Sequence, residues 1–417
     1  MPDVTIYALR MNKQTIAIIG GGPAGATAAE KLAKGWRLAS PGNGGRRVLV
    51  FEEKLGWEKP CGGGLTHKAL KCYPFLERAA EGANLLHDAE FIAASGTALR
   101  FHLRFPLAIY SRSTLNQLLL RRAEAAGAEI IAARIVGLRR RDLTWEITGR
   151  GKAYRADFIV LAAGARTRLR QTFAPDFLPQ DFTLTFGYYL DAPCELLRVR
   201  FFDNFEGYAW AFPRPDHLAV GIGGKAGMQP MAALRNRLGD FMKKSGYTPD
   251  PNRIYSHLLP SLSVESWGNL RLVGKGWALA GDAAGLVDPM TGEGIYYAMR
   301  SGDLLAGALL EGCPEIYPER VRNDFGRSLA LAARLTRMFY HGEFLGGGVT
   351  SRMIEFGTYS QKLLGVLQDL IAGTLSYAGL IARLPMGLAH ALVGRGVTLL
   401  RSAFELPPEQ LPKGPAG

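Results

Sequence analysis

Short apolar runs that end at glycine mark the start of the chain. Residues 15–19 form a β-branched apolar run that ends at Gly20, and residues 24–33 are rich in helix formers. Residues 48–51 form a second apolar strand after a Gly/Pro/Asn-rich stretch, residues 40–45, which is typical of a surface loop. This order predicts a βαβ unit at the start of the chain.

The pattern then changes along the chain. Residues 115–126 have helical spacing, while residues 158–162 form the continuous apolar run expected of a buried parallel strand. Residues 183–224 read as short aromatic-rich strands separated by turns, which indicates an antiparallel sheet. Residues 277–280 return to a buried strand before a glycine-rich turn and a helix, and the chain beyond residue 324 is mostly helical in pattern.

These segments predict an α/β fold in which a discontinuous Rossmann-type domain contains an inserted antiparallel β-sheet domain and is followed by a C-terminal helical region. We place the Rossmann-type domain at residues 12–75, 105–170 and 270–325, the inserted domain at residues 76–104 and 171–269, and the helical region at residues 326–417.

Composition narrows the class of protein. With 47% hydrophobic residues, a chain of 417 residues buries a substantial core. Lys plus Arg outnumber Asp plus Glu by 50 to 37, which favours anionic partners. Because the basic residues are scattered along the chain, nucleic acid ranks last among the candidate partners. The four cysteines are far apart and form no Cys-x-x-Cys pair, which argues against a disulfide framework and against a metal site. We therefore expect a reducing compartment and no bound metal.

The sequence shows neither a secretory signal in its first 14 residues nor an uncharged run long enough to span a membrane. We expect a cytoplasmic protein. Residues 363–404 are largely apolar with interspersed basic residues, a composition that fits either a peripheral contact with the inner face of the membrane or a helical cap over a ligand.

The first candidate binding motif is a G-x-G-x-x-G set formed by Gly20, Gly22 and Gly25, with Ala24 inside it. Glycines permit a tight turn and allow backbone N–H groups to approach a pyrophosphate at the positive end of a helix. Glu52 ends the second predicted strand, where a carboxylate accepts hydrogen bonds from ribose hydroxyls. The context of strand, turn, helix and acidic residue predicts a dinucleotide site.

A second motif lies near residue 280. Gly281 and Asp282 follow a predicted strand and lead to a turn that contains Gly292, Gly294 and Ile295. A carboxylate at a strand end can bind the ribityl or ribose hydroxyls of a flavin nucleotide, and a glycine turn at a helix start can present N–H groups to the flavin ring. The dinucleotide predicted here is FAD.

These motifs resemble those of the flavoprotein group that contains para-hydroxybenzoate hydroxylase, flavin halogenases and geranylgeranyl reductases. The segment K-P-C-G-G-G at residues 59–64 and the pattern Y-A-W-A-F-P at residues 208–213, followed by G-I-G at residues 221–223, are similar to those of the geranylgeranyl reductases. The resemblance covers residues 15–302. It implies an FAD-dependent enzyme that saturates carbon-carbon double bonds of isoprenoid chains.

The resemblance also implies roles for individual residues. Near the flavin it places Cys61, Gly62, Gly63 and Gly64. Elsewhere along the FAD, Arg112 is expected at the phosphates or the flavin edge and Ile135 at the adenine, and Gly164 is also assigned to the cofactor site. Along the isoprenoid tunnel it places the residues Tyr208, Trp210, Phe212, Pro213, Gly221 and Gly223. The thiol of Cys61 is the candidate proton donor, with a small packing residue as the alternative and His67 as a weaker candidate.

One position departs from the pattern of the group. Ala163 stands where hydroxylases have an aspartate tied to flavin and nicotinamide contacts. This weakens the hydroxylase interpretation and leaves NAD(P)H and a ferredoxin-like protein as the candidate electron donors.

The expected partner is an isoprenoid lipid or a prenyl diphosphate. The rival enzyme class is an FAD-dependent monooxygenase or halogenase that acts on an aromatic or polyketide substrate. A third class, a flavin electron-transfer module without turnover, is disfavoured because such a module needs no aromatic tunnel.

Overall fold

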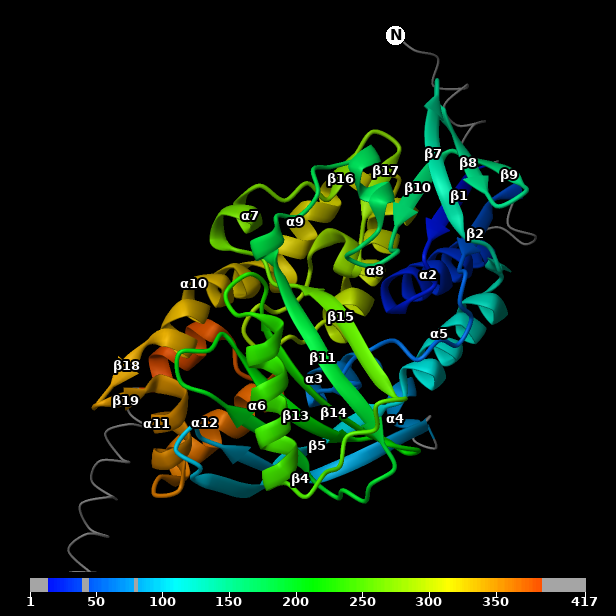
Figure 1. Ribbon diagram of the computed structural model, residues 1–417. Helices are drawn as coiled ribbons and strands as arrows, with labels where there is room; N and C mark the ends of the chain where they lie inside the picture. The colour runs from blue at the N-terminus through cyan, green and yellow to red at the C-terminus, as the bar shows by residue number, and fades with distance from the viewer. Residues whose placement is uncertain (1–13, 40–44, 79–81, 385–417) are drawn as a thin grey trace, which may run out of the picture.

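The computed structural model describes residues 14–39, 45–78 and 82–384, which form two sheets with a helical region beside them (Figure 1). The first sheet has the order β16-β17-β10-β1-β2-β6. Its strands are β1 (Thr15–Ile19), β2 (Arg47–Phe51), β6 (Glu129–Ile131), β10 (Phe158–Leu161), β16 (Val273–Gly274) and β17 (Trp277–Leu279). All adjacent pairs are parallel except β16 and β17. The predicted βαβ opening and the buried central strands are confirmed.

Three helices flank this sheet: α2 (Pro23–Ala39), α5 (Arg112–Ala126) and α8 (Ile295–Leu310). A three-stranded antiparallel sheet projects from the same end of the molecule and consists of β7 (Ile135–Arg141), β8 (Thr144–Gly149) and β9 (Ala153–Ala156). The central strands are almost fully buried because helices cover them, which is why their sequences are continuous apolar runs.

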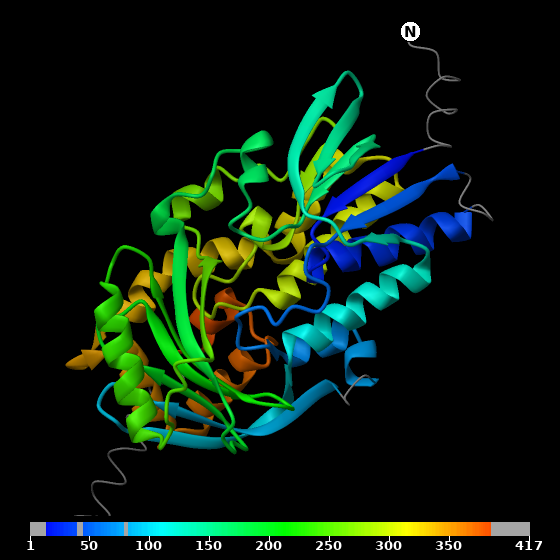
Figure 2. The same ribbon diagram turned by 45° about the vertical axis from the view of Figure 1, so that its right-hand side comes forward.

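The second sheet has the order β15-β11-β14-β13-β12-β4-β5-β3 and is antiparallel except between β12 and β4. Its strands are β3 (Gly64–Leu65), β4 (Ala83–Ile92), β5 (Ala98–Tyr110), β11 (Phe182–Leu190), β12 (Leu197–Phe201), β13 (Gly207–Pro213), β14 (Leu218–Lys225) and β15 (Ile254–Pro260). The long β4–β5 hairpin runs along the edge of the molecule away from the first sheet (Figure 2). The predicted inserted antiparallel sheet is confirmed.

The two faces of the second sheet have different neighbours. Helix α6 (Met231–Lys244) packs on one face, against side chains such as Ala209 and Ile222. The C-terminal region packs on the other face, over β4, β5 and β12. That region contains α10 (Arg327–His341), the hairpin β18 (Glu343–Phe344) and β19 (Gly347–Gly348), α11 (Val349–Gly357) and α12 (Gln361–Ile371).

Shorter helical segments connect these parts of the molecule. They are α3 (His67–Cys72), α4 (Phe75–Arg78), α7 (Val264–Gly268), α9 (Tyr317–Val321), the 3-10 turn η5 (Gly281–Ala284) and the π-helical turn η7 (Arg322–Gly326). None of the helices in the described part of the chain has the length and apolar character that a membrane crossing needs.

The predicted domain boundaries stay predictions, but one of them can be located on a strand. Strand β5 belongs entirely to the second sheet, so the boundary at residue 105 falls inside one strand. Strand β3 pairs with β5, so the segment at residues 59–64 leads from the first sheet directly into the second. Residues 385–417 of the predicted helical region lie outside the described residues.

The contact between α2 and α8 gives a test of the packing. A Cβ atom added to Gly302 in α8 would lie 2.2 Å from the carbonyl oxygen of Ala24 in α2, so Gly302→Ala forces the two helices apart. We expect it to lower the free energy of unfolding by about 1–3 kcal/mol in urea denaturation. Gly239→Ala in α6 is the matched control, because no atom lies within 4 Å of the added Cβ; it should stabilise by about 0.5–1 kcal/mol. Equal effects of the two substitutions would contradict this packing.

Candidate functional site

The glycine loop after β1 contains glycines with two different constraints. A Cβ on Gly20 (φ +106°) would lie 2.5 Å from the carbonyl oxygen of Ala162, and one on Gly25 would lie 1.9 Å from that of Gly20. The fold itself therefore requires these two glycines. Gly22 has no atom within 4 Å of such a Cβ and lines a cavity at the start of α2. The protein leaves this side of the loop open.

Glu52 at the end of β2 holds the loop in place. One carboxylate oxygen accepts the backbone N–H of Gly21 at 2.8 Å, and the other accepts that of Lys54 at 2.9 Å. Glu52 also lines the cavity, as expected for a carboxylate that meets the ribose of a bound nucleotide.

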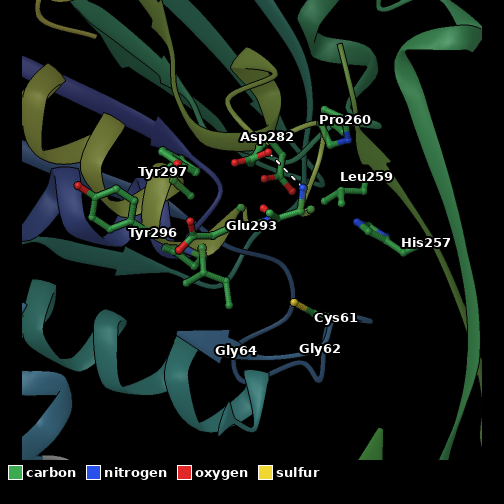
Figure 3. Close-up of a pocket in the computed structure, with 18 of the residues that line it drawn as sticks. Cys61, Gly62, Gly64, His257, Leu259, Pro260, Asp282, Glu293, Tyr296 and Tyr297 are labelled. Atoms are coloured by element: carbon green, nitrogen blue, oxygen red, sulfur yellow. Dashed lines mark hydrogen bonds between the residues drawn. The ribbon is translucent and has the colours of Figure 1, made fainter. Parts of the chain in front are cut away.

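A largely buried ion pair also lines the cavity. Lys59 Nζ is 2.7 Å from Asp282 Oδ2, the carboxylate predicted to bind the flavin nucleotide (Figure 3). Burial alone would raise the pKa of Asp282, but the charge of Lys59 and its hydrogen bond keep the pKa below its usual value. Asp282 is therefore an anion that can accept hydrogen bonds from ligand hydroxyls.

These features share one cavity of about 1500 Å³, above the range of about 300–1,000 Å³ that is usual for a single small-molecule site. Of the predicted cofactor residues, Gly25 and Gly281 pack behind the lining, and the others line the cavity: Gly20, Gly22, Ala24, Glu52, Cys61, Gly62, Gly63, Gly64, Arg112, Ile135, Gly164, Asp282, Gly292, Gly294 and Ile295. The cavity is large enough for a dinucleotide and a second ligand.

Strand β13 supplies an aromatic wall to the same cavity. Tyr208, Trp210 and Phe212 line it, whereas Ala209 and Ala211 point to α6, as the two-residue period of a strand requires. On the neighbouring strand, Gly221 and Gly223 lie opposite Trp210 and Tyr208. A Cβ on Gly221 would lie 2.6 Å from the Trp210 ring, so this glycine makes room for the indole behind the lining. Pro213 also lies outside the lining.

The Cys61 loop lies between the cofactor side and the aromatic wall. The N–H of Gly63 points to the Cys61 sulfur at 3.3 Å, and Gly62 packs against the Phe212 ring, where a Cβ would lie 2.3 Å from ring carbons. Burial raises the pKa of the Cys61 thiol, but Arg112 and Arg214 together bring the pKa below its ordinary value. The thiol thus has a stabilised conjugate base.

Sequence reasoning missed several charged residues of the site. Glu58 and Arg214 form an ion pair beside the Cys61 loop. Lys68 pairs with Glu293 at 3.2 Å, and both residues line the cavity. Lys59 and Glu293 lay inside motifs that were recognised but received no role. His67, the weaker proton-donor candidate, stacks on the ring of Phe105 with centroids 4.0 Å apart and is not part of the cavity lining.

His257 on β15 is another lining residue that the sequence did not reveal (Figure 3). Burial, and after it the charge of Lys59, lower its pKa to about 3. The imidazole is therefore neutral across the physiological pH range and presents a hydrogen-bonding group to the cavity without a charge.

The parallel sheet, the open glycine loop and the two strand-end carboxylates define a dinucleotide-binding oxidoreductase fold. The family model described as FAD dependent oxidoreductase matches residues 67–298, and the chain belongs to that family. The cradle fits the cofactor: Gly22 leaves open space at a helix start, and the carboxylates of Glu52 and Asp282 in the cavity lining offer hydrogen-bond acceptors.

Curated relatives include geranylgeranyl reductases, and solved flavoproteins share the fold. A chloroplastic geranylgeranyl diphosphate reductase of Arabidopsis thaliana is 27% identical over 73% of this chain and 67% of its own. A geranylgeranyl bacteriochlorophyll reductase-like protein of Thermoplasma acidophilum has a similar structure, with a TM-score of 0.71 at 19% identity over 91% of this chain and 98% of its own. A flavin-dependent brominase has a TM-score of 0.67 at 17% identity over 94% and 99%. The structural matches establish the fold alone.

The open space beside Gly22 leads to a prediction for a substitution that adds one methyl group: it should weaken flavin binding without changing the stability of the apoprotein. Gly22→Ala adds a Cβ that meets no protein atom within 4 Å, so the unfolding of the apoprotein should be unchanged. We expect FAD to bind against this backbone, where a clash of about 1.4 kcal/mol would weaken binding about tenfold. Flavin absorbance relative to protein absorbance measures the loss. Full flavin occupancy in this variant would show that the cofactor does not lie against Gly22.

His257 predicts a pH effect on stability. Its folded pKa of about 3 is below the ordinary 6.5, so the unfolded chain takes up the proton first, and stability falls as the pH drops from about 6.5 toward 3. Between pH 7 and pH 5 the wild type should lose at least about 1 kcal/mol more unfolding free energy than His257→Asn in urea titrations. Equal losses in both proteins would mean that His257 is protonated in the folded state.

Proposed function

We propose that this protein is an FAD-dependent reductase that saturates carbon-carbon double bonds of geranylgeranyl or related isoprenoid chains. The observation that carries the proposal is the position of Cys61 where the cofactor side of the cavity meets the aromatic wall of β13. The relatives named geranylgeranyl diphosphate reductase support it.

The lining beyond the Cys61 loop suits an apolar chain. It comes from the second sheet and the C-terminal helices and includes Phe91, Leu107, Val199, Phe201, Phe339, Met353, Ile354 and Leu367. An isoprenoid offers almost only apolar surface, so its binding energy comes from contact with such walls. A chain held in this part of the cavity excludes water from the reacting double bond.

When bound, reduced FAD supplies a hydride to one carbon of the double bond. The other carbon needs a proton, and we assign this role to the Cys61 thiol: its S–H bond breaks, and the proton forms the second new C–H bond. The thiolate left behind is stabilised by Arg112, Arg214 and the N–H of Gly63, and it regains its proton from solvent. The stabilised thiolate makes Cys61 a stronger acid than an ordinary thiol.

Two parts of the proposal concern partners. The electron donor is NAD(P)H or a small redox protein such as ferredoxin, and the assay below separates these sources by adding each alone.

Peripheral contact with a membrane would bring a lipid substrate to the cavity. The membrane contact is inferred from the apolar segment at residues 363–404. The part of this segment from residue 385 onward lies outside the described residues.

The test of the reaction is anaerobic incubation of the flavin-loaded protein with dithionite and geranylgeranyl lipid or diphosphate, read by mass spectrometry. We expect products that gain two hydrogens per step. Parallel reactions replace dithionite with NADPH, NADH or reduced ferredoxin. Absence of these products, with oxygen-dependent hydroxylation or halogenation of aromatic compounds instead, would replace the proposal with the rival class.

Cys61→Ser tests the proton donor. The hydroxyl preserves the size of the side chain but is a far weaker acid, so the reduction rate should fall about 100-fold while flavin content stays unchanged. In the wild type the rate should decline as pH rises through the thiol pKa, and this decline should begin below the ordinary thiol value of 9.0. A serine variant with wild-type rate would remove Cys61 from the mechanism.

A further inference from the structure

Arg214 is a buried guanidinium at the point where β13 ends. Its side chain is 0% exposed. One terminal nitrogen donates to the carboxylate of Glu58, and the other donates to the carbonyl oxygen of Cys61. A single planar group therefore bridges two residues of the loop that carries the thiol, a geometry that the fork of an arginine allows and a lysine does not.

Glu58 extends this bridge to helix α5. Besides Arg214, its carboxylate accepts the backbone N–H groups of Arg112 and Ser113, each at 2.9 Å, and the hydroxyl of Ser111 at 2.6 Å. An anion that accepts N–H groups at a helix N-terminus is stabilised there, and the pKa of Glu58 is below its usual value despite its burial. The network ties the aromatic strand, the Cys61 loop and the start of α5 together.

The arrangement is more than the fold needs. A buried ion pair is often replaceable by apolar side chains without loss of stability, because desolvation offsets its attraction. Here Arg214 binds the carbonyl oxygen of Cys61, the one cysteine of the cavity lining, and its charge acts on the thiol. Arg214 Nε is buried with no hydrogen-bond partner in the described part of the chain. A reason other than stability is therefore needed for a cation at this place.

We propose that Arg214 is a positioning residue for the reduction: balanced by Glu58, it fixes the Cys61 thiol beside the aromatic wall and sets how readily the thiol gives up its proton. The inference rests on the donor role of Cys61 in the proposed function. It adds that the residue following the Y-A-W-A-F-P segment controls the thiol, so the strand that contacts the substrate also holds the acid.

The electrostatic surroundings of the thiol come from several elements. The groups that interact with it electrostatically are Lys59 on its own loop, Arg112 on α5, Arg214 after β13, Tyr208 on β13, Tyr189 on β11 and Tyr255 on β15. The tyrosines are neutral near pH 7, because burial raises the pKa of all three. The charges that matter are thus the cations, with Glu58 as the carboxylate paired to one of them.

The test measures the charge on Cys61 directly. The flavin-loaded protein, without prenyl substrate, is alkylated with iodoacetamide across pH 5–10, and the Cys61 peptide is followed by mass spectrometry apart from the peptides of the other cysteines. Arg214→Gln removes the cation and should raise the apparent thiol pKa by about one unit. Glu58→Gln leaves Arg214 unbalanced and should lower it.

Opposite shifts distinguish the proposal from a structural role, because loosening of the loop would move both variants in the same direction. Arg214→Lys keeps the charge but not the bridge, so it should retain most of the wild-type thiol pKa and lose reduction rate. Arg200→Lys is the matched control: Arg200 is nearly buried, pairs with Asp240 on α6 at 3.2 Å and lies outside the cavity lining. It should leave both the alkylation profile and the reduction rate unchanged.

Two results would overturn the inference: shifts of the same sign in Arg214→Gln and Glu58→Gln, or no shift in Arg214→Gln. The alkylation contains no substrate, so it is read independently of the proposed function, whose own failure would be the absence of +2 products in the wild type.

Discussion

The close crossing of α2 and α8 is the constraint on which the site depends. The two helices lie more than 250 residues apart in sequence, yet the backbone of Gly302 packs against the carbonyl of Ala24. This contact holds the start of α8 against the start of α2, and the turn before α8, with Gly292 and Gly294, lines the same cavity as the glycine loop before α2. A side chain at Gly302 would push the two helices apart, and with them the two halves of the predicted cofactor site, so this close crossing depends on a residue without a side chain.

The sequence predicted those parts of the molecule that depend on local patterning. Strands β1, β2 and β10 could be predicted because parallel strands covered by helices are apolar on both faces. The alternation of side chains between the two faces of β13 could be predicted as well, but the sequence pattern does not determine which face lines a cavity. That depends on α6 covering Ala209 and Ala211, and on the glycines of β14 leaving space beside the rings.

The missed residues have a common physical reason. Arg214 and Glu58 are 156 positions apart, and each looks like an ordinary charged residue in its own segment. Only the pairing of β3 with β5 and the end of β13 bring the two side chains together. The same holds for Lys59 and Asp282, which are separated by 223 positions and meet inside the cavity. A single sequence shows the motif that carries such a residue but not the partner that gives it a function.

The fold alone does not separate a reductase from a brominase, since both have structures similar to this one. The difference must lie in what faces the cofactor. The proposed reduction of unactivated double bonds needs a proton donor beside an apolar chain. Cys61, a partly buried thiol in the cavity wall with cations nearby, meets that need, because the cations stabilise the anion that the transfer creates. Without the cations, burial would make the thiol a weaker acid than it is in water. In the proposed reaction, Arg112 and Arg214 therefore lower the pKa of the Cys61 thiol enough for it to act as the acid in an otherwise apolar pocket.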